Sequence, residues 1–158
     1  MASEFNLNNL RVDQLGYIYR DIRKQAKILE QKFNIPKFVF IENKDKKYYY
    51  RGKETIISTE IGLSRIFNTQ IELIQLIKGE CIFTEFLNAG KEGLHHFGVF
   101  VTNLDEIVSH YKEMGFEVVH EGIAAGRQKV TYIDTYDILG VYVEFQESIK
   151  RKRKKNRK

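Results

Sequence analysis

The sequence has few of the residues that hold small folds together by covalent bonds or structural metals. Its 158 residues contain one cysteine, Cys81, one proline and no tryptophan. A single cysteine excludes a disulfide framework within the chain, and no cysteine–histidine cluster has zinc-finger spacing. No apolar run approaches the roughly 18 residues of a membrane-spanning helix. The first ten residues, MASEFNLNNL, lack the apolar stretch of a signal peptide, so we expect a cytoplasmic protein with no membrane contact.

Positive charge is abundant, but it is confined to one end of the chain. Hydrophobic residues make up 42% and charged residues 30%, which is typical of a globular domain, and the net charge is +5. The last nine residues, 150–158, carry eight positive charges and no negative one. Without them, 18 Lys and Arg face 21 Asp and Glu, which leaves −3. We therefore predict a mildly acidic body with a basic, disordered tail at 148–158, and we do not expect the tail to bind nucleic acid.

Two segments of the chain share one order of strand, polar break and amphipathic helix. They are residues 12–35 and 94–118, and their alignment places Gln14 on His96, with a glycine two residues after each. Each segment is followed by three strand-like stretches, at 37–42, 55–67 and 70–77 in the first copy and at 116–121, 128–134 and 140–147 in the second. Each copy therefore predicts a β-α-β-β-β unit.

One such unit is too small to bury a core alone, so the two copies must pair. We predict an α+β fold in which two tandem βαβββ modules form a curled, eight-stranded mixed sheet around a metal-binding cavity. The charged stretch 42–54 is predicted as a longer loop or a hairpin. The expected boundaries are an N-terminal extension at 1–11 and a single domain at 12–147, with module one at 12–78, a linker with a short helix at 79–93, and module two at 94–147.

Polar residues interrupt the apolar strands at matching places in the two copies. Glu72 lies within TQIELIQLI and Glu144 within GVYVEFQE, and a carboxylate inside a closed sheet is costly unless it is paired or bound to a metal. Gln14 and His96 lie in the first strand of each copy. One imidazole, two carboxylates and one amide oxygen suit a divalent first-row metal. We therefore predict Gln14, Glu72, His96 and Glu144 as metal ligands, and Glu144 or Glu72 as the group that moves a proton.

The other three histidines are not expected to take part. Strand alternation places His95 on the face opposite to His96, where it would pack or support its neighbour. His110 falls on a predicted helix and His120 at a strand end, so both are predicted to lie at the surface.

At these residues the chain resembles the vicinal oxygen chelate superfamily, which includes glyoxalases, bleomycin-resistance proteins, extradiol dioxygenases and methylmalonyl-CoA epimerases. Members carry His or Gln in the first strand of a module and Glu in its last, as this chain does. The local sequence is most similar to that of methylmalonyl-CoA epimerases in four segments: 71–75 (IELIQ), 83–87 (FTEFL), 92–106 (EGLHHFGVFVTNLDE) and 133–145 (IDTYDILGVYVEF). The resemblance covers about residues 12–147.

The chain differs from two families of this superfamily at positions that bear on its chemistry. Extradiol dioxygenases hold iron with two histidines and one carboxylate, and Gln14 argues against that chemistry. Glyoxalase I has an asparagine-tryptophan-glycine motif after its first glutamate, whereas this chain continues with IQLIKG. The Gln/Glu/His/Glu set nevertheless occurs in eukaryotic-type glyoxalase I.

The resemblance implies a metal-dependent enzyme that epimerises or isomerises a 2-substituted acyl thioester through a metal-stabilised enolate. The metal would be Co, Zn, Ni or Mn, the substrate a CoA or glutathione thioester, and the assembly a homodimer. Two alternatives stay open, a glyoxalase I-like lactoylglutathione lyase and a non-catalytic small-molecule-binding protein of the same fold. The 20 Tyr and Phe residues would suit the apolar cavity of such a binder.

Overall fold

The computed structural model describes residues 9–150 of the chain. The predicted extension at 1–11 and the basic tail at 148–158 therefore lie largely outside the described residues. The first half contains β1 (Gln14–Ile18), α1 (Ile22–Phe33), β2 (Val39–Tyr50), β3 (Lys53–Ile66), β4 (Thr69–Lys78) and α2 (Ile82–Asn88). The second half contains β5 (Gly93–Phe100), α3 (Leu104–Glu113), β6 (Val118–Ala124), a 3-10 turn (Ala125–Arg127), β7 (Gln128–Ile133), α4 (Tyr136–Leu139) and β8 (Tyr142–Ser148).

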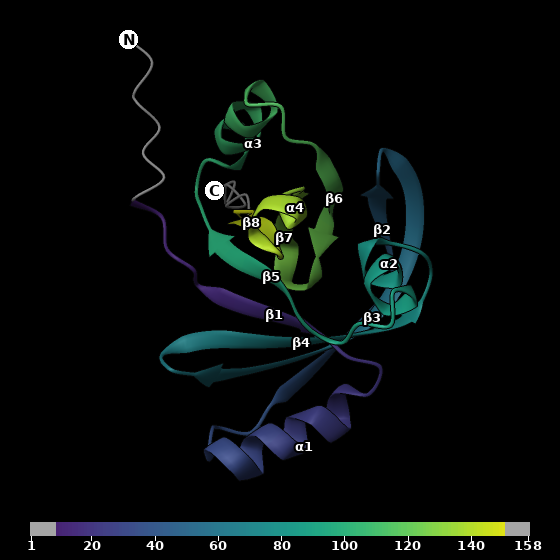
Figure 1. The fold of residues 1–158 in the computed structure, drawn as a ribbon, viewed down its shortest axis with the longest axis vertical. Coiled ribbons are helices and arrows are strands. Elements are labelled where there is room, and N and C mark those ends of the chain that lie inside the picture. The colour runs from purple at the N-terminus through teal and green to yellow at the C-terminus, as the bar shows by residue number, and fades with distance from the viewer. Residues whose placement is uncertain (1–8, 151–158) are drawn as a thin grey trace, which may run out of the picture.

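The described strands form one closed barrel in the order β1-β4-β3-β2-β6-β7-β8-β5. β1 runs parallel to β4, and β5 runs parallel to β8, while the other neighbours are antiparallel. Two antiparallel contacts join the modules, β1 with β5 and β2 with β6 (Figure 1). The predicted α+β architecture, with two βαβββ units in a mixed eight-stranded sheet, is confirmed.

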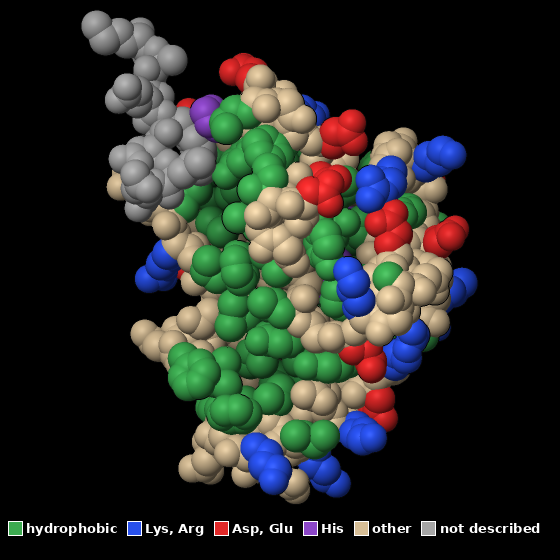
Figure 2. Space-filling model, viewed as in Figure 1, with side chains coloured by type: hydrophobic (Ala, Val, Ile, Leu, Met, Phe, Trp, Pro, Cys, Tyr) green, Lys and Arg blue, Asp and Glu red, His purple; other side chains and the backbone are tan. Residues whose placement is uncertain are grey.

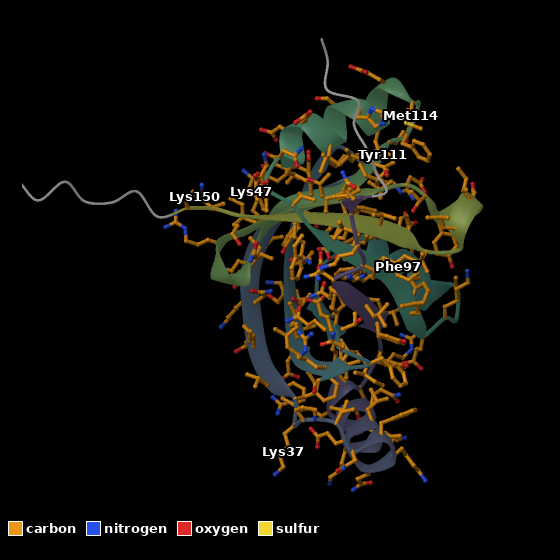
Figure 3. The ribbon with its side chains drawn as sticks, turned by 90° about the vertical axis from the view of Figure 1, so that its left-hand side faces the viewer. Lys37, Lys47, Phe97, Tyr111, Met114 and Lys150 are labelled. Carbon is orange, nitrogen blue, oxygen red and sulfur yellow. The ribbon has the colours of Figure 1, made fainter. Side chains whose placement is uncertain are left out.

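Local sequence signals set the ends of the long helices. α1 begins after Asp21, whose side chain accepts a hydrogen bond from the Lys24 amide at 2.9 Å, and it ends at Asn34, which is left-handed with φ 50°. α3 is followed by Gly115 with φ 88°. The two helices lie at opposite ends of the molecule, with Lys37 beside α1 and Met114 at the end of α3 (Figure 3). They therefore cover the outside of the barrel and leave its interior to other residues.

The charged stretch 42–54 forms a hairpin rather than a loop. β2 continues to Tyr50, and the chain turns through Arg51 and Gly52, both with positive φ, into β3. The far end of this hairpin brings β2 alongside β6. The extra residues of module one thus close the barrel.

Three hydrophobic clusters hold the fold together. α1 and α3 each pack on the outer side of the barrel, through Ile22 and Ala26 in one case and Leu104 and Ile107 in the other. The third cluster lies inside the barrel and includes most of α2, whose buried residues are Ile82, Phe83, Phe86 and Leu87. The predicted linker helix therefore fills one end of the barrel, and the polar residues of the interior lie beyond it.

Apolar side chains gather on the face of the molecule where β1 and β5 run in Figure 1 (Figure 2). None of the described helices is long and apolar enough to cross a lipid bilayer. The cytoplasmic location stays a prediction.

Candidate metal centre

Three ionisable side chains meet inside the barrel. Glu72 of β4, His96 of β5 and Glu144 of β8 are buried, and one possible ligand atom from each lies within 4.8 Å of the others. His96 Nε2 is 3.4 Å from Glu72 Oε2 and 3.3 Å from Glu144 Oε2. Nε2 nevertheless has no hydrogen-bond partner. An imidazole nitrogen between two carboxylates, without a hydrogen bond of its own, is well placed to share a cation with them.

A glycine makes room for this arrangement. Gly16 of β1 lies opposite His96 on one side and Glu72 on the other. A Cβ atom at this position would lie 2.0 Å from the His96 ring. The glycine that follows Gln14 in the sequence repeat is therefore required for the imidazole to reach the centre.

Gln14 lies beside this group and is linked to it by hydrogen bonds. Its Nε2 donates to Gln70 Oε1 at 2.8 Å, and its Oε1 accepts from Gln146 Nε2 at 2.9 Å. Gln146 Nε2 also donates to Glu144 Oε2 at 2.7 Å. The structure thus brings together three of the four predicted ligands, and the role of Gln14 as a ligand stays a prediction. Gln146 was not anticipated, although it lies two residues after Glu144 and so on the same face of β8.

The electrostatics of the group follow from burial and proximity. Burial raises the pKa of Glu72 above its ordinary value. Burial alone would lower the pKa of His96, but the two nearby carboxylates outweigh it and raise that pKa to about 9. Two carboxylates facing one imidazole leave an excess of acceptor groups in a buried space, which a cation would balance.

His95 is also inside the barrel, contrary to the prediction from strand alternation. The pairing of β1 with β5 skips one residue, because Gly16 pairs with His96 and Tyr17 with Leu94. His95 is the extra residue of this irregularity, and it is fully buried against Phe83 and Phe86. Its Nδ1 lies 3.1 Å from His96 Nδ1, and burial holds its pKa well below the ordinary value. A neutral His95 can accept a hydrogen bond from His96 Nδ1, so the proton that a metal would displace from His96 is the one on Nε2.

His120 was predicted at the surface, and that prediction is wrong. It is 1% exposed and lies within β6, where the pairing with β7 shifts between Val118 and His120. His110, on α3, is half-buried and its ring contacts Tyr111 at an angle of 83°. Of these two histidines, His120 is the one that faces the barrel interior.

A small cavity of about 30 Å³ adjoins the metal centre inside the barrel. Glu72 and Glu144 line it together with Asn43, His120 and Tyr132. Burial raises the pKa of Tyr132 well above its ordinary value, so this hydroxyl stays protonated. The remaining lining is mostly apolar, from Tyr48, Ile57, Thr59, Ile61, Ile74, Phe83, Ala124 and Val130.

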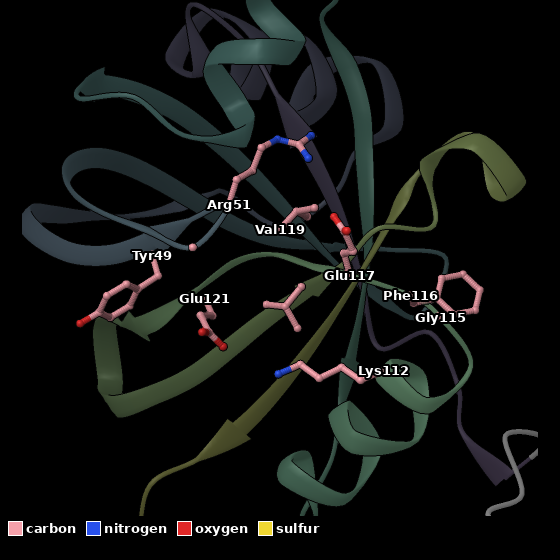
Figure 4. A pocket seen from close by; sticks show the side chains of 10 residues that line it. Tyr49, Arg51, Lys112, Gly115, Phe116, Glu117, Val119 and Glu121 are labelled. Atoms are coloured by element: carbon pink, nitrogen blue, oxygen red, sulfur yellow. The ribbon is translucent and has the colours of Figure 1, made fainter.

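A larger, open pocket of about 590 Å³ lies on the outside of the molecule (Figure 4). Arg51 and Lys112 lie on opposite sides of it, with Glu117 and Glu121 between them (Figure 4). The Arg51 guanidinium is 2.8 Å from a carboxylate oxygen of Glu85. None of the predicted ligands lines this pocket, so the candidate chemistry lies in the inner cavity instead.

The residues present fit a divalent metal ion. Two carboxylates and one imidazole are common ligands of first-row metals, and the partnerless Nε2 and the space left by Gly16 are what such a site requires.

Comparison with known families supports this interpretation. The profile of the Glyoxalase/Bleomycin resistance protein/Dioxygenase superfamily matches residues 13–133. The chain belongs to this superfamily. Members of the superfamily typically use a divalent metal, which agrees with the buried Glu-His-Glu group. A search of curated proteins found no match.

Several solved structures share the fold at low sequence identity. A hypothetical protein from Bacillus halodurans C-125 has a TM-score of 0.70 and 18% identity, covering 91% of this chain and 98% of that one. Methylmalonyl-CoA epimerase from Mycobacterium tuberculosis has a TM-score of 0.67 and 16% identity, covering 95% and 94%. A Streptomyces coelicolor methylmalonyl-CoA epimerase in complex with 2-nitronate-propionyl-CoA has a TM-score of 0.67 and 14% identity, covering 89% and 98%. At these identities the likeness establishes the fold alone.

Proposed function

We propose that this superfamily member is a metal-dependent enzyme that moves a proton on the carbon next to a thioester carbonyl, and so epimerises or isomerises a 2-substituted acyl thioester. The observation that carries the proposal is the buried group of Glu72, His96 and Glu144, with His96 Nε2 unpaired between two carboxylates. The structural neighbours that are methylmalonyl-CoA epimerases support the choice of a CoA thioester.

Glu72, His96 and Glu144 would hold the ion, and Gln14 is the predicted fourth ligand. To reach it, Gln14 Oε1 must give up the hydrogen bond from Gln146. A bound Co, Zn, Ni or Mn ion supplies positive charge that polarises a carbonyl oxygen and acidifies the neighbouring C–H bond. His95 orients the His96 ring through the contact between their Nδ1 atoms.

The two carboxylates can serve as the proton carriers. Epimerisation requires that a proton leave one face of a carbon and return to the other face. Glu72 comes from β4 and Glu144 from β8, the strands on either side of the β1–β5 pair in the barrel. Their placement on separate strands therefore supports removal by one carboxylate and return by the other. Gln146 fixes Glu144 Oε2 by a hydrogen bond and so sets the orientation of that carboxylate.

A second candidate is a glyoxalase I-like lyase acting on a hemithioacetal. No Lys or Arg is among the residues that line the inner cavity, which favours a substrate with an uncharged hydroxyl over one with a free carboxylate at that place.

The test measures metal content and two activities on the same untagged protein. The proposal expects one divalent ion per chain, and deuterium exchange at C2 of methylmalonyl-CoA in D₂O. Turnover of the glutathione–methylglyoxal hemithioacetal without that exchange would select the lyase. Tight binding of small apolar ligands by a metal-free, inactive protein would select the non-catalytic binder. His96→Ala serves as the control, since it should lose both the metal and the activity.

The predicted homodimer is tested separately, by light scattering coupled to size exclusion. The apolar face over β1 and β5 supports the prediction, because monomeric proteins rarely expose large contiguous apolar areas (Figure 2).

A further inference from the structure

The inner cavity contains two polar atoms that the metal centre does not use. Asn43 Oδ1, from β2, and His120 Nδ1, from β6, are buried and have no hydrogen-bond partner. The two residues are 2% and 1% exposed, and both line the cavity that Glu72 and Glu144 also line. A buried polar atom without a partner costs about 1–3 kcal/mol. Two of them around one cavity indicate a ligand that pairs with them.

The histidine is held in place before any ligand arrives. Its ring stacks on Tyr48 with centroids 4.7 Å apart, and the ring of Tyr132 lies 5.4 Å away at 75°. Gly122 permits the Tyr48 stacking, since a Cβ there would lie 2.5 Å from the Tyr48 ring. An imidazole fixed between aromatic rings loses little conformational entropy on binding, which suits a recognition role.

The chemistry of the cavity restricts what can bind beside these atoms. No Lys or Arg lines it, and burial lowers the pKa of His120 to about 4, so the imidazole is neutral at pH 7. An anionic group would therefore be buried without a counter-charge, which is costly. Asn43 Oδ1 can only accept a hydrogen bond, whereas Nδ1 of a neutral imidazole can donate or accept, so a hydroxyl can pair with both atoms.

The size of the cavity points to the same group. Its volume is about 30 Å³, and a single water needs roughly 10–15 Å³. A hydroxyl-sized group fits this space, whereas the remainder of a substrate must lie outside it.

We propose that Asn43 and His120 form a subsite for one uncharged hydroxyl group on the substrate atom next to those that the metal centre binds. The subsite rests on the proposed function, because the same substrate must also reach Glu72 and Glu144. Its consequence is a preference for short hydroxylated acyl groups over acyl groups that carry a second carboxylate at this position.

Calorimetric titration of the metal-loaded protein with three small acids tests the subsite. Lactate and glycerate both offer a carboxylate and a 2-hydroxyl to a metal, and glycerate adds a hydroxyl on its third carbon. Tartronate carries a carboxylate at that third carbon instead. We expect glycerate to bind about tenfold more tightly than lactate, as one good hydrogen-bonding site provides. Tartronate should gain nothing from its additional carboxylate.

Two variants test whether Asn43 and His120 cause the preference for glycerate over lactate. Asn43→Leu and His120→Phe should each reduce the ratio of glycerate to lactate affinity to near one while keeping the full metal content. Ile57→Val, which removes one methylene from the same lining, is the matched control and should retain the ratio.

Each result decides between the two proposals. Absence of a bound metal would overturn the proposed function and the subsite with it. Full metal content with equal lactate and glycerate affinities, or an unchanged ratio in Asn43→Leu, would overturn only the subsite. Tartronate binding more tightly than glycerate would overturn the assignment to an uncharged group.

Discussion

The two modules have the same backbone pairing but use their equivalent polar residues differently. In module one, β1 pairs with β4 so that Gly16 faces Glu72, and in module two β5 pairs with β8 so that Gly98 faces Glu144. β1 and β5 are antiparallel neighbours, and each glycine therefore lies opposite the polar residue of the other module. His96 crosses Gly16 to reach both carboxylates, whereas Gln14, which lies against Gly98, is hydrogen bonded to two other glutamines.

The cause of this difference lies in two further positions of the repeat. Gln70 of module one corresponds to Tyr142 of module two, since each pairs with the polar residue of its first strand. Ile74 of module one corresponds to Gln146 of module two. Module two thus supplies the donor that holds Gln14 Oε1. The backbone geometry of the repeat is thus preserved, while the differences at these two positions give Gln14 hydrogen-bond partners that His96 does not have.

The largest difference between the modules is expected when the polar residue of each first strand, His96 or Gln14, is replaced by alanine. His96→Ala should weaken metal binding at least about 1,000-fold, about 4 kcal/mol, because it removes a ligand from the centre itself. Gln14→Ala should cost less, about tenfold, because Gln14 Oε1 must give up the hydrogen bond from Gln146 before it can bind the ion. Competition against a chromophoric chelator measures both. Equal losses would show instead that the two first-strand residues contribute equally to metal binding, against the asymmetry of the modules.

Exchanging the two glycines for alanine should have the next largest effect. Gly16→Ala should lower the free energy of unfolding by about 3 kcal/mol, because its Cβ would overlap a fully buried ring. Gly98→Ala should cost less, about 2 kcal/mol, since its Cβ would approach Gln14 Cβ and Oε1 only to 2.8 Å. Urea unfolding of the metal-free proteins compares them. A larger loss for Gly98→Ala would reverse the proposed asymmetry of the modules.

The smallest effect is expected when module two is made to resemble module one at Gln146. In Gln146→Leu, Gln14 Oε1 loses its donor, so the metal-free protein should lose about 1 kcal/mol of stability. If Gln14 then turns to the ion, the loss should disappear in the metal-loaded protein. Thermal unfolding with and without the metal measures this difference, and Ser148→Ala, on the same strand but away from Gln14, is the control. An equal loss in both states would mean that Gln14 does not respond to the metal.

The repeat, the architecture and the meeting of Glu72, His96 and Glu144 follow from period-two alternation, which is regular in these strands. Strand alternation misplaced His95, and a predicted strand end misplaced His120. Both residues lie next to an irregularity of strand pairing. One extra residue in a strand changes which side chains face inward, and no turn residue or charge marks it in the sequence. Gln146 was missed for a different reason, because its partner Gln14 is 132 residues away.

The contact between β2 and β6 has a consequence for the exchange of molecules with the interior. Its register pairs are Tyr48–Gly122, Tyr49–Glu121 and Tyr50–His120, the shortest ladder of the described barrel. One further hydrogen bond, from the Arg51 amide to the Val119 carbonyl, extends it. Separating these two strands parts fewer paired residues than separating any other described neighbours, so local opening should cost least there. Amide protons along this ladder should then exchange with solvent sooner than those of β1 and β5. The separation of β2 from β6 would then be both the most frequent local opening of the barrel and the route by which a ligand enters.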